Sequence, residues 1–404
     1  MKVSVRHLII PGLSTLFLLN VISDEMHLMQ HINARMKVES KAFDASFLVT
    51  ATGASSPPAA VASPVVTNLT CLKKSGYNFH AWNPNTNFTW RVMSTVQIEK
   101  SQPSGFASRC DWVIGSRPVH WKMVKANTAW GNVERLPRTI FLQTDELQKF
   151  NDRVLPCFPA SHRFVIIIGD HDRTTPQQVD VRYNSPTLNN EDWQAWLADE
   201  RILHLFVEHL DTPSPSNRVT PIPLGLNPVE HENSNPDVLY NAAPASVQFS
   251  GRPIRMVFTN RVREGPQWQD RADASQMCAR LPHCDLMTSV EESEYVASIQ
   301  RYAFLLCVHG GGIDPNPNLF TALLAGVIPI MAPFPGQSAY DGLPILITDG
   351  NWNESSPFFS EDYLLQKAKE FAPYLEDPAK RANVLERLSS KYWWDKVIQQ
   401  LASA

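Results

Sequence analysis

A run of glycines follows an apolar stretch near the middle of the second half of the chain. Residues 310–312 are all glycine and come directly after His309, and Asn316 with Pro317 then offers a helix N-cap followed by a first-turn proline. Glycines let a ligand approach the main chain, and a helix start presents free N–H groups and a positive dipole end. These features suit a phosphate, and a nucleotide diphosphate is the expected ligand.

A second group of polar residues ends another predicted strand. Asp170, His171 and Asp172 follow the apolar run 164–168, at the carboxyl end of a strand, where open α/β sheets bind ligands. One of them could act as general base toward a hydroxyl acceptor. Two alternatives stay open: the residues cap the next turn, or the two aspartates hold a divalent metal, for which two carboxylates are weak evidence.

The identity of the base is not decided by the sequence. The strand predicted at 202–207 ends on the same side and is followed by Glu208, His209 and Asp211. Arg261 and Arg263 lie just past the predicted strand 254–259, where guanidinium groups can clamp phosphate through two parallel hydrogen bonds. Exposure to solvent is the alternative for both arginines, since arginine is commonly exposed.

The His-Gly-Gly-Gly string also occurs in another enzyme class. After a strand it forms the oxyanion loop of α/β-hydrolase esterases, which need a Gly-x-Ser-x-Gly elbow and then a downstream Asp and His. The sequence contains no Gly-x-Ser-x-Gly, and His309 is its last histidine. We therefore set the esterase hypothesis aside, and a tight turn without function remains as the alternative to phosphate binding.

Hydrophobic periodicity predicts two α/β domains around these residues. The Gly-rich loop lies between a strand at 303–308 and a helix that starts after Asn316, ends at Gly326 and is followed by a strand at 327–331. Further strands are predicted at 138–142, 164–168, 202–207, 219–224, 254–259, 286–288 and 344–348. Helices are predicted at 267–281, at 361–375 and at 378–401, the last with the bulky residues Tyr392, Trp393 and Trp394.

The composition fits a large globular protein that does not bind nucleic acid. The chain has 404 residues, 43% of them hydrophobic, which is enough for the cores of two domains. Its formal charge is -4 and its sequence contains no basic block, so nucleic acid is not expected as a partner. None of the six cysteines forms a C-x-x-C pair, so a structural zinc site is not expected. Cys278 and Cys284 are close enough in sequence to form a disulfide.

The N-terminal residues predict entry into the secretory pathway. Lys2 and Arg6 precede an apolar stretch over 8–22, which is short for a membrane span of roughly 20 residues. A cleaved signal peptide and a signal anchor over residues 1–23 compete, and the missing small-x-small cleavage site favours the anchor. Residues 24–75 include an Ala/Ser/Pro-rich segment and are expected to form a disordered stem. Glycosylation sequons begin at Asn68, Asn87 and Asn353.

Several strings in this order resemble the exostosin-like glycosyltransferases. The most specific are FLLCVHGGGID (304–314), LFTALLAGVIPI (319–330) and YDGLP (340–344). Upstream, IIGD (167–170) and IPLGL (222–226) resemble that family's acceptor-side landmarks, and KYW (391–393) resembles its closing helix. The resemblance extends in order over roughly residues 138–396.

The resemblance implies an α/β protein of GT-B architecture, with two Rossmann-like domains facing a cleft. It implies inverting transfer of a hexose or pentose from a nucleotide diphosphate sugar, with a UDP-sugar as the expected donor, to a hydroxyl of a glycan or glycoprotein. Such a direct displacement requires no metal and no cofactor. It also implies a single-pass type II protein of the Golgi membrane with a lumenal catalytic body, and a secreted protein is the alternative.

The domain boundaries follow from the segments described above and from a polar, small-residue interval at 241–253, which is expected to be the interdomain linker. We expect a signal anchor at 1–23, a stem at 24–75, an N-terminal acceptor-side domain at 76–245, a C-terminal donor domain at 246–385 and a closing helix at 386–404. The residues expected to bind the donor are Arg261, Arg263, His309, Gly310, Gly311, Gly312, Asp314, Asn318 and Thr321. Asp170, His171 and Asp172 are the candidate catalytic residues.

One departure from the family pattern bears on the function. The family has an arginine before the aromatic residue of the helix and an acidic residue where Thr321 stands, a carboxylate that would hold the ribose hydroxyls. The segment Asn318-Leu319-Phe320-Thr321 carries neither charge. Nucleotide affinity and donor choice are therefore open, and a non-catalytic lumenal sugar-binding or structural relative is the alternative function.

Overall fold

A computed structural model places the two α/β domains and most of the residues discussed above. It describes residues 71, 80–81, 107, 109–114, 136–169, 172–214, 216–226, 243–287, 290 and 292–403. The predicted signal anchor and, except for Cys71, the predicted stem lie outside the described residues. Within the described part of the chain, no helix is both long enough and apolar enough to cross a membrane.

The N-terminal lobe is built on a six-stranded sheet with the order β1-β2-β3-β4-β5-β6. Its strands are β1 (His80–Ala81), β2 (Trp112–Ile114), β3 (Thr139–Gln143), β4 (Phe164–Gly169), β5 (Ile202–Val207) and β6 (Val219–Pro221). β1 pairs antiparallel with β2, and all the other pairs are parallel. The four strands predicted in this region are confirmed as β3 to β6.

The helices that the structure describes in this lobe pack on one face of its sheet. The connecting elements are η3 (Thr144–Glu146), α4 (Leu147–Arg153), η4 (Leu155–Cys157) and α5 (Asn190–Ala198). Ile140 and Leu142 of β3 share one cluster with Phe150 of α4 and Trp196 of α5. Since neighbouring strands follow chain order and such crossovers are right-handed, consecutive helices fall on the same side of the sheet. The opposite face must therefore be covered from elsewhere.

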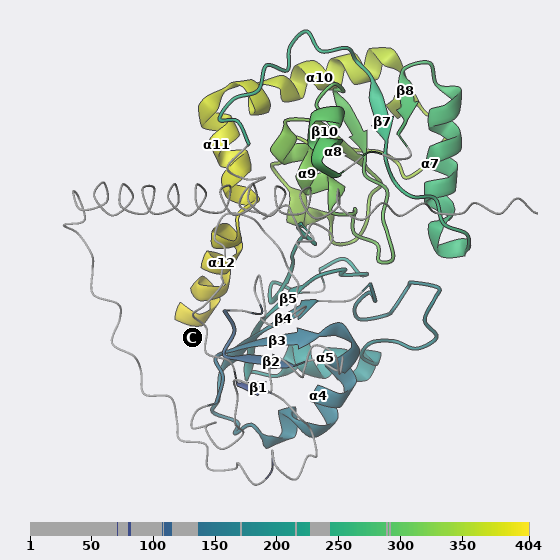
Figure 1. The fold of residues 1–404 in the computed structure, drawn as a ribbon. Helices are drawn as coiled ribbons and strands as arrows, with labels where there is room; N and C mark the ends of the chain where they lie inside the picture. Colours follow the sequence, from purple (N-terminus) through teal and green to yellow (C-terminus); the bar gives the residue numbers. More distant parts are fainter. Residues whose placement is uncertain are drawn as a thin grey trace, which may run out of the picture. The chain divides into compact units, whose positions relative to one another are not determined.

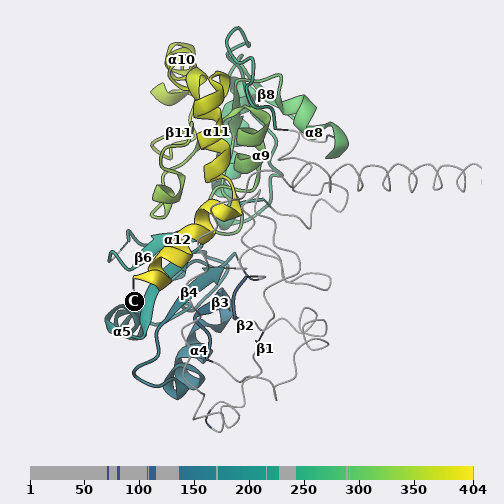
Figure 2. The same cartoon turned by 90° about the vertical axis from the view of Figure 1, so that its left-hand side faces the viewer.

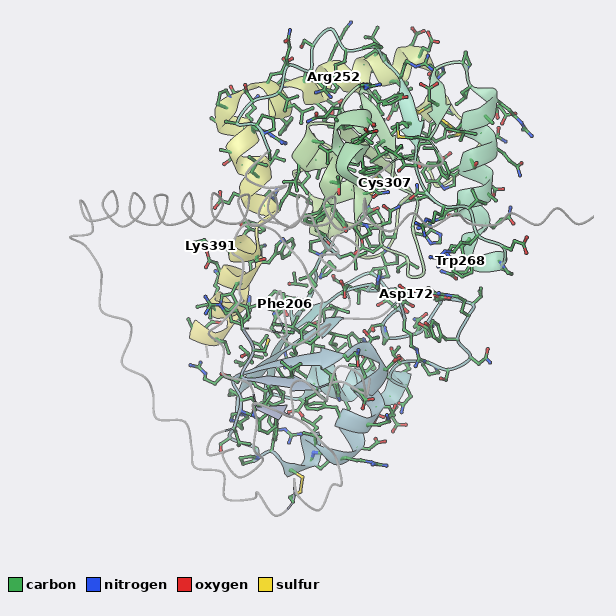
Figure 3. The ribbon with its side chains drawn as sticks, in the orientation of Figure 1. Asp172, Phe206, Arg252, Trp268, Cys307 and Lys391 are labelled. Atoms are coloured by element: carbon green, nitrogen blue, oxygen red, sulfur yellow. A yellow bond between two sulfur atoms is a disulfide. The ribbon has the colours of Figure 1, made fainter. Side chains whose placement is uncertain are left out.

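The C-terminal helix α12 (Ser390–Ala402) covers that opposite face. Phe206 of β5, labelled in Figure 3, belongs to the same buried cluster as Trp393 of α12. The guanidinium of Arg138 also donates to the backbone oxygen of Leu401 at 2.8 Å. Figures 1 and 2 show α12, in yellow, beside the strands β4 and β5. The bulky residues of the last helix thus close the core of the N-terminal lobe.

The C-terminal lobe contains a second sheet, which is entirely parallel, with the order β11-β10-β9-β7-β8. Its strands are β7 (Met256–Phe258), β8 (Cys284–Leu286), β9 (Phe304–Leu306), β10 (Ile328–Met331) and β11 (Leu346–Ile347). Its helices are η5 (Pro266–Trp268), α7 (Gln269–Arg280), α8 (Glu292–Ile299), α9 (Asn318–Ala325), η6 (Gln337–Tyr340), η7 (Pro357–Phe359), α10 (Glu361–Glu376) and α11 (Pro378–Arg387). The two lobes confirm the predicted pair of Rossmann-like α/β domains.

The strand order of the second sheet reverses between β7 and β9. The chain passes from β7 to the edge strand β8 and then returns to the other side of β7 as β9. In open α/β sheets, ligands bind outside the carboxyl ends of the strands at such a switch point. The loop after β7 carries Arg261, and the loop after β9 carries the glycines 310–312. The topology therefore places the Gly-rich loop where a ligand is expected.

Two element predictions need correction. The single helix predicted over 378–401 is two helices, because Ser389 has an extended backbone (ψ 146°) and its side chain accepts the N–H of Tyr392 as the N-cap of α12. The strand predicted at 286–288 instead spans Cys284–Leu286. The predicted helix end at Gly326 is confirmed, since this glycine adopts the left-handed conformation with φ 70°.

Two disulfides occur among the described residues. Cys278–Cys284 joins the end of α7 to β8 and confirms the pairing expected from the sequence spacing. Cys71–Cys157 ties a residue of the predicted stem to the N-terminal lobe. Cys110 and Cys307 are free and buried.

Candidate functional site

The Gly-rich loop is held between β7, β9 and α9 by two asparagines. Asn316 donates from Nδ2 to the backbone oxygen of Val308 (2.7 Å), and its Oδ1 accepts the N–H of Asn318 (2.8 Å). Asn316 also hydrogen-bonds Asn260, which donates to the backbone oxygen of Leu306 at 2.9 Å. The side chain of Asn316 thus accepts the first N–H of the helix, but the N-cap position is held by Pro317, one residue later than the sequence predicts.

Arg271 of α7 supports the loop from the C-terminal lobe. Its Nε donates to the backbone oxygen of His309 at 2.8 Å, and its Nη1 donates to that of Arg261 at 3.2 Å. A Cβ placed on Gly310 would lie 3.2 Å from Nη2 of Arg271. The side chain is buried, with 9% of its surface exposed. A cationic group thus lies against the first glycine and joins the loops that follow β7 and β9.

The second glycine contacts polar side chains of the N-terminal lobe. A Cβ on Gly311 would collide with the carboxylate of Asp172 and with Nη2 of Arg182. Nη2 of Arg182 lies 3.0 Å from Oδ2 of Asp172. In addition, Gln267 donates to the backbone oxygen of Gly311 (2.6 Å) and accepts from the N–H of Val181 (3.2 Å). The two lobes therefore meet at this glycine, on the loop that follows the switch point.

Arg182 is fixed by groups other than Asp172. Its Nε lies 3.0 Å from both carboxylate oxygens of Asp180, whose side chain is fully buried. Its guanidinium also lies over the rings of Tyr183 (5.4 Å) and Trp268 (5.1 Å). The hydrogen bonds to Asp180 and then to Asp172 raise the pKa of Arg182, so it carries a positive charge at any physiological pH. Figure 3 labels Asp172 and Trp268, the partners of Arg182 in the two lobes.

The third glycine contacts His209, which follows β5. Ring atoms of His209 would lie 2.5 Å from a Cβ on Gly312. The side chain of His209 is buried, and its Nδ1 accepts the N–H of Asp314 at 3.4 Å. The backbone of His209 is left-handed, with φ 51°, a conformation that is uncommon outside glycine and often found at functional sites. The imidazole is thus held against the Gly-rich loop.

The acidic neighbours of His209 have different surroundings. Asp211 accepts from Thr174 Oγ1 (2.7 Å) and from the N–H groups of Gln177 (3.2 Å) and Gln178 (2.8 Å), so it organises the loop after Asp172. Its burial raises its pKa. Glu208 is buried against Gly169 at the end of β4.

Asp314 links the lobes from within the Gly-rich loop. It is buried, with 2% of its surface exposed. One carboxylate oxygen accepts the N–H of Leu224 at 3.2 Å, and the other forms a short hydrogen bond with the hydroxyl of Tyr340. Burial raises the pKa of Asp314 to about 8, so the group is largely protonated at neutral pH. Asp314 thus bonds Leu224 of the N-terminal lobe and Tyr340 of the C-terminal lobe.

The remaining predicted donor residues are more dispersed. Arg261 and Arg263 are exposed, and the guanidinium of Arg263 lies 5.5 Å from the ring of Trp268. Nδ2 of Asn318 donates to Oγ1 of Thr259 at 3.3 Å. Thr321 is buried, and its hydroxyl donates to the backbone oxygen of Pro317 at 3.5 Å. Asp170 and His171 lie outside the described residues, so the catalytic assignments to them stay predictions.

Sequence reasoning missed Arg271, Arg182 and Gln267. Arg271 carried a signal: a basic residue in the first turn of a helix is unfavourable for the helix dipole, so it suggests a specific role. Arg182 and Gln267 lie in segments without a recognisable motif. The contact of Arg182 with Gly311 depends on how the two lobes meet, and that of Gln267 depends on how the loops after β7 and β9 pack together. Periodicity reports neither.

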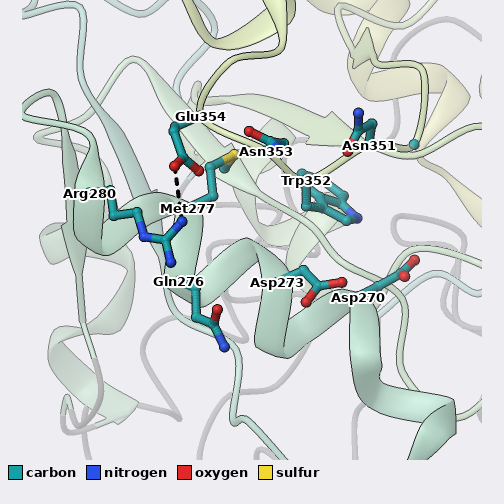
Figure 4. A pocket seen from close by; sticks show the side chains of 10 residues that line it. Asp270, Asp273, Gln276, Met277, Arg280, Asn351, Trp352, Asn353 and Glu354 are labelled. Atoms are coloured by element: carbon teal, nitrogen blue, oxygen red, sulfur yellow. Dashed lines mark hydrogen bonds and ion pairs between the residues drawn. The ribbon is translucent and has the colours of Figure 1, made fainter.

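A separate hollow of about 280 Å³ opens between α7 and residues 350–354 (Figure 4). Asp270, Asp273 and Trp352 are among its lining residues, and Arg280 forms an ion pair with Glu354 at 2.9 Å beside it. Asp270 also lies 3.3 Å from Nε2 of His309. Asp270 and His309 thus connect the hollow to the Gly-rich loop, but the glycines 310–312 are not among its lining residues. Among the residues that the structure describes, no three His, Cys, Asp or Glu side chains cluster as metal ligands would.

Comparisons with protein families and with curated proteins find no match. Among solved structures, the apo structure of OtsA matches at 10% identity over 65% of this chain and 72% of its own, with a TM-score of 0.33. An α1,3-fucosyltransferase matches at 11% identity over 67% and 79%, with a TM-score of 0.32. The catalytic domain of starch synthase IV from Arabidopsis thaliana, bound to ADP and acarbose, matches at 12% identity over 70% and 76%, with a TM-score of 0.30. Such low scores and identities carry no conclusion about activity.

Proposed function

We propose that this protein is a glycosyltransferase that moves a sugar from a nucleotide diphosphate sugar, with a UDP-sugar as the expected donor, to a hydroxyl of a glycan or glycoprotein. The observation that carries the proposal is the meeting of the Gly-rich loop, at the switch point of the C-terminal sheet, with Asp172, Arg182 and His209 of the N-terminal lobe. The resemblance to exostosin-like transferases in the same loop supports it. The finer assignment to that family is part of the proposal.

The donor diphosphate would lie against the Gly-rich loop. Arg271 and Arg182 supply positive charge beside Gly310 and Gly311, whereas the first N–H groups of α9 are bonded to Asn316 and Pro317. Guanidinium groups favour phosphate oxygens. Together they would stabilise the negative charge that develops on the leaving diphosphate.

The reaction would be a single displacement with inversion at the anomeric carbon. The acceptor oxygen forms a bond to that carbon while the bond between the carbon and the diphosphate oxygen breaks, and the electron pair leaves with the diphosphate. The hydroxyl proton passes to a base, for which Asp172 and His209 lie against the loop and Asp170 and His171 are the further candidates. These side chains serve the reaction without a metal or cofactor.

A non-catalytic sugar-binding relative is the second candidate function. The observation that favours it is Thr321, which stands where a carboxylate is expected for the ribose and whose hydroxyl bonds its own helix. The purified protein should be incubated with a panel of nucleotide sugars, and donor hydrolysis, transfer and nucleotide binding should be measured. The proposed transferase requires hydrolysis or transfer with at least one donor, reduced in Asp172→Ala. Nucleotide binding without either reaction, or no binding at all, would favour the non-catalytic relative.

We further propose that residues 1–23 anchor the protein in the Golgi membrane with its body in the lumen. The basic residues before the apolar stretch support this orientation, and Asn353 of the third sequon is exposed. In cultured cells, the protein should stay in the membrane pellet after alkaline extraction, and Asn353→Gln should remove one endoglycosidase-sensitive glycan. Recovery in the medium would instead support the secreted alternative.

A further inference from the structure

The carboxylate of Asp172 occupies the place on the Gly-rich loop that a phosphate would need. Gly311 has no side chain, and the space where a Cβ would stand is filled by the carboxylate of Asp172 and by Nη2 of Arg182. The two groups form an ion pair at 3.0 Å. A Gly-rich loop at a switch point is suited to an anion, and the chain supplies an anion of its own.

The two members of this ion pair differ in their exposure to solvent. Arg182 is bound by the buried carboxylate of Asp180 through three contacts and lies over Trp268 and Tyr183. The side chain of Asp172 is 53% exposed, against 25% for that of Arg182, and an exposed ion pair holds its partners weakly. A ligand can therefore reach the carboxylate of Asp172 from solvent and displace it from Arg182, which stays beside Gly311.

We infer that Asp172 is an internal competitor of the donor diphosphate, and that Arg182 is a phosphate-binding residue contributed by the N-terminal lobe. Donor binding would displace the carboxylate of Asp172 from Arg182, and a phosphate oxygen would take its place on the guanidinium. Guanidinium binds phosphate through parallel hydrogen bonds at least as well as it binds a carboxylate. The inference rests on the proposed function for the presence of a diphosphate, and it assigns donor binding to the lobe that the resemblance assigns to the acceptor.

The displacement would also set the order of events. As long as Asp172 is paired with Arg182, its Oδ2 accepts a hydrogen bond from the guanidinium and is not available to accept the proton of the acceptor hydroxyl. Once a diphosphate takes over Arg182, the carboxylate is released beside the reacting groups. Donor binding would thus precede activation of the acceptor hydroxyl.

The test is the affinity for UDP and for inorganic pyrophosphate, measured by titration calorimetry on the purified protein. Asp172→Asn removes the competing charge and should tighten both ligands by about three- to tenfold. Glu200→Gln is the matched control, because it removes one carboxylate of the same lobe that is 88% exposed and paired with Arg163 at 3.4 Å. It should change the affinities by less than about twofold.

Arg182 is tested in the opposite direction. Arg182→Lys keeps the charge but loses the two-pronged geometry, and it should weaken UDP by about tenfold. Melting temperatures of all variants show whether the fold is intact, and a gain of affinity in Asp172→Asn cannot come from damage to the fold. If the wild type binds UDP but Asp172→Asn binds it no tighter, the inference is wrong and the proposed function stands. If neither UDP nor pyrophosphate binds to any form of the protein, both are wrong.

Discussion

Gly312→Ala should disrupt the site through a collision with His209, because the backbone conformation at this position is one that alanine can adopt. None of the glycines 310–312 has a positive φ, so alanine is acceptable at each position apart from its extra carbon. At Gly312 that carbon would lie 2.5 Å from ring atoms of His209, whereas ordinary contacts begin near 3.4 Å, so the ring must move by about 1 Å. His209 is buried and bound to the N–H of Asp314, which limits such a movement.

The expected cost follows from this displacement. Overpacking of this size typically destabilises a protein by about 1–3 kcal/mol. A shift of about 1 Å in a group that positions substrate can cost on the order of a hundredfold in rate. Gly310→Ala is the milder comparison, because its Cβ would lie 3.2 Å from Nη2 of Arg271 and that atom need move by only a few tenths of an ångström. The assays are thermal unfolding and turnover of the donor identified by the nucleotide-sugar panel.

A double-mutant cycle isolates the cause. If the collision with His209 is responsible, His209→Ala opens space, and Gly312→Ala should cost at least about 0.5 kcal/mol less in that background than in the wild type. The reasoning is refuted if Gly312→Ala costs the same with and without His209. It is also refuted if Gly310→Ala and Gly312→Ala lower the melting temperature equally.

Three further predictions concern other parts of the chain. Asp314→Asn should remove a pH dependence of stability: the pKa of Asp314 is raised to about 8, so its contribution is complete below its unfolded pKa of about 4 and is lost as the pH rises toward 8. In chemical unfolding, the difference in free energy between wild type and variant should therefore fall by on the order of 2 kcal/mol from pH 5 to pH 7, and an unchanged difference would contradict it. Arg271→Ala should weaken UDP binding by about tenfold or more, because a buried charged hydrogen-bond donor is lost. Arg261→Ala, at an exposed side chain, should change the affinity for UDP by less than about threefold. Equal losses of affinity in calorimetry would show that burial does not determine which arginine binds UDP. Trp393→Ala, at a residue that is only 4% exposed, should lower the free energy of unfolding by about 3–5 kcal/mol. Tyr374→Ala, at a residue that is 38% exposed, is the control and should change it little. Comparable denaturation curves for the two variants would contradict the packing of α12 against the N-terminal sheet.

The local structure around the Gly-rich loop could be predicted because it depends on neighbouring residues. The side chain of Asn316 accepts the first N–H of α9, and Gly326 ends the same helix in the left-handed conformation. Buried strands on either side show as short apolar runs because a parallel sheet is covered on both faces. The boundary at Ser389 was missed because the apolar periodicity continues across it, while the capping hydrogen bond that separates the two helices is local.

The contacts that assemble the site could not be predicted in the same way. His209 and Gly312 meet across about one hundred residues, and Asp172 reaches Gly311 from a different strand end. Periodicity indicates which face of a strand is buried, but it does not indicate which loops of two lobes face each other. Residue type also misled: Arg261 and Arg263 stand past a strand end and are exposed, while Arg271 lies in the first turn of α7 and is buried against the loop.

The strand order of the N-terminal lobe explains why the last helix matters for the candidate site. Consecutive neighbouring strands place α4 and α5 on one face, while α12, which follows directly on the last helix of the C-terminal lobe, covers the other. The C-terminal segment thus completes the core of the lobe that carries Asp172 and His209. Loosening α12 should therefore disturb the register between these side chains and the glycines that they contact, even though the Gly-rich loop itself is built by the other lobe.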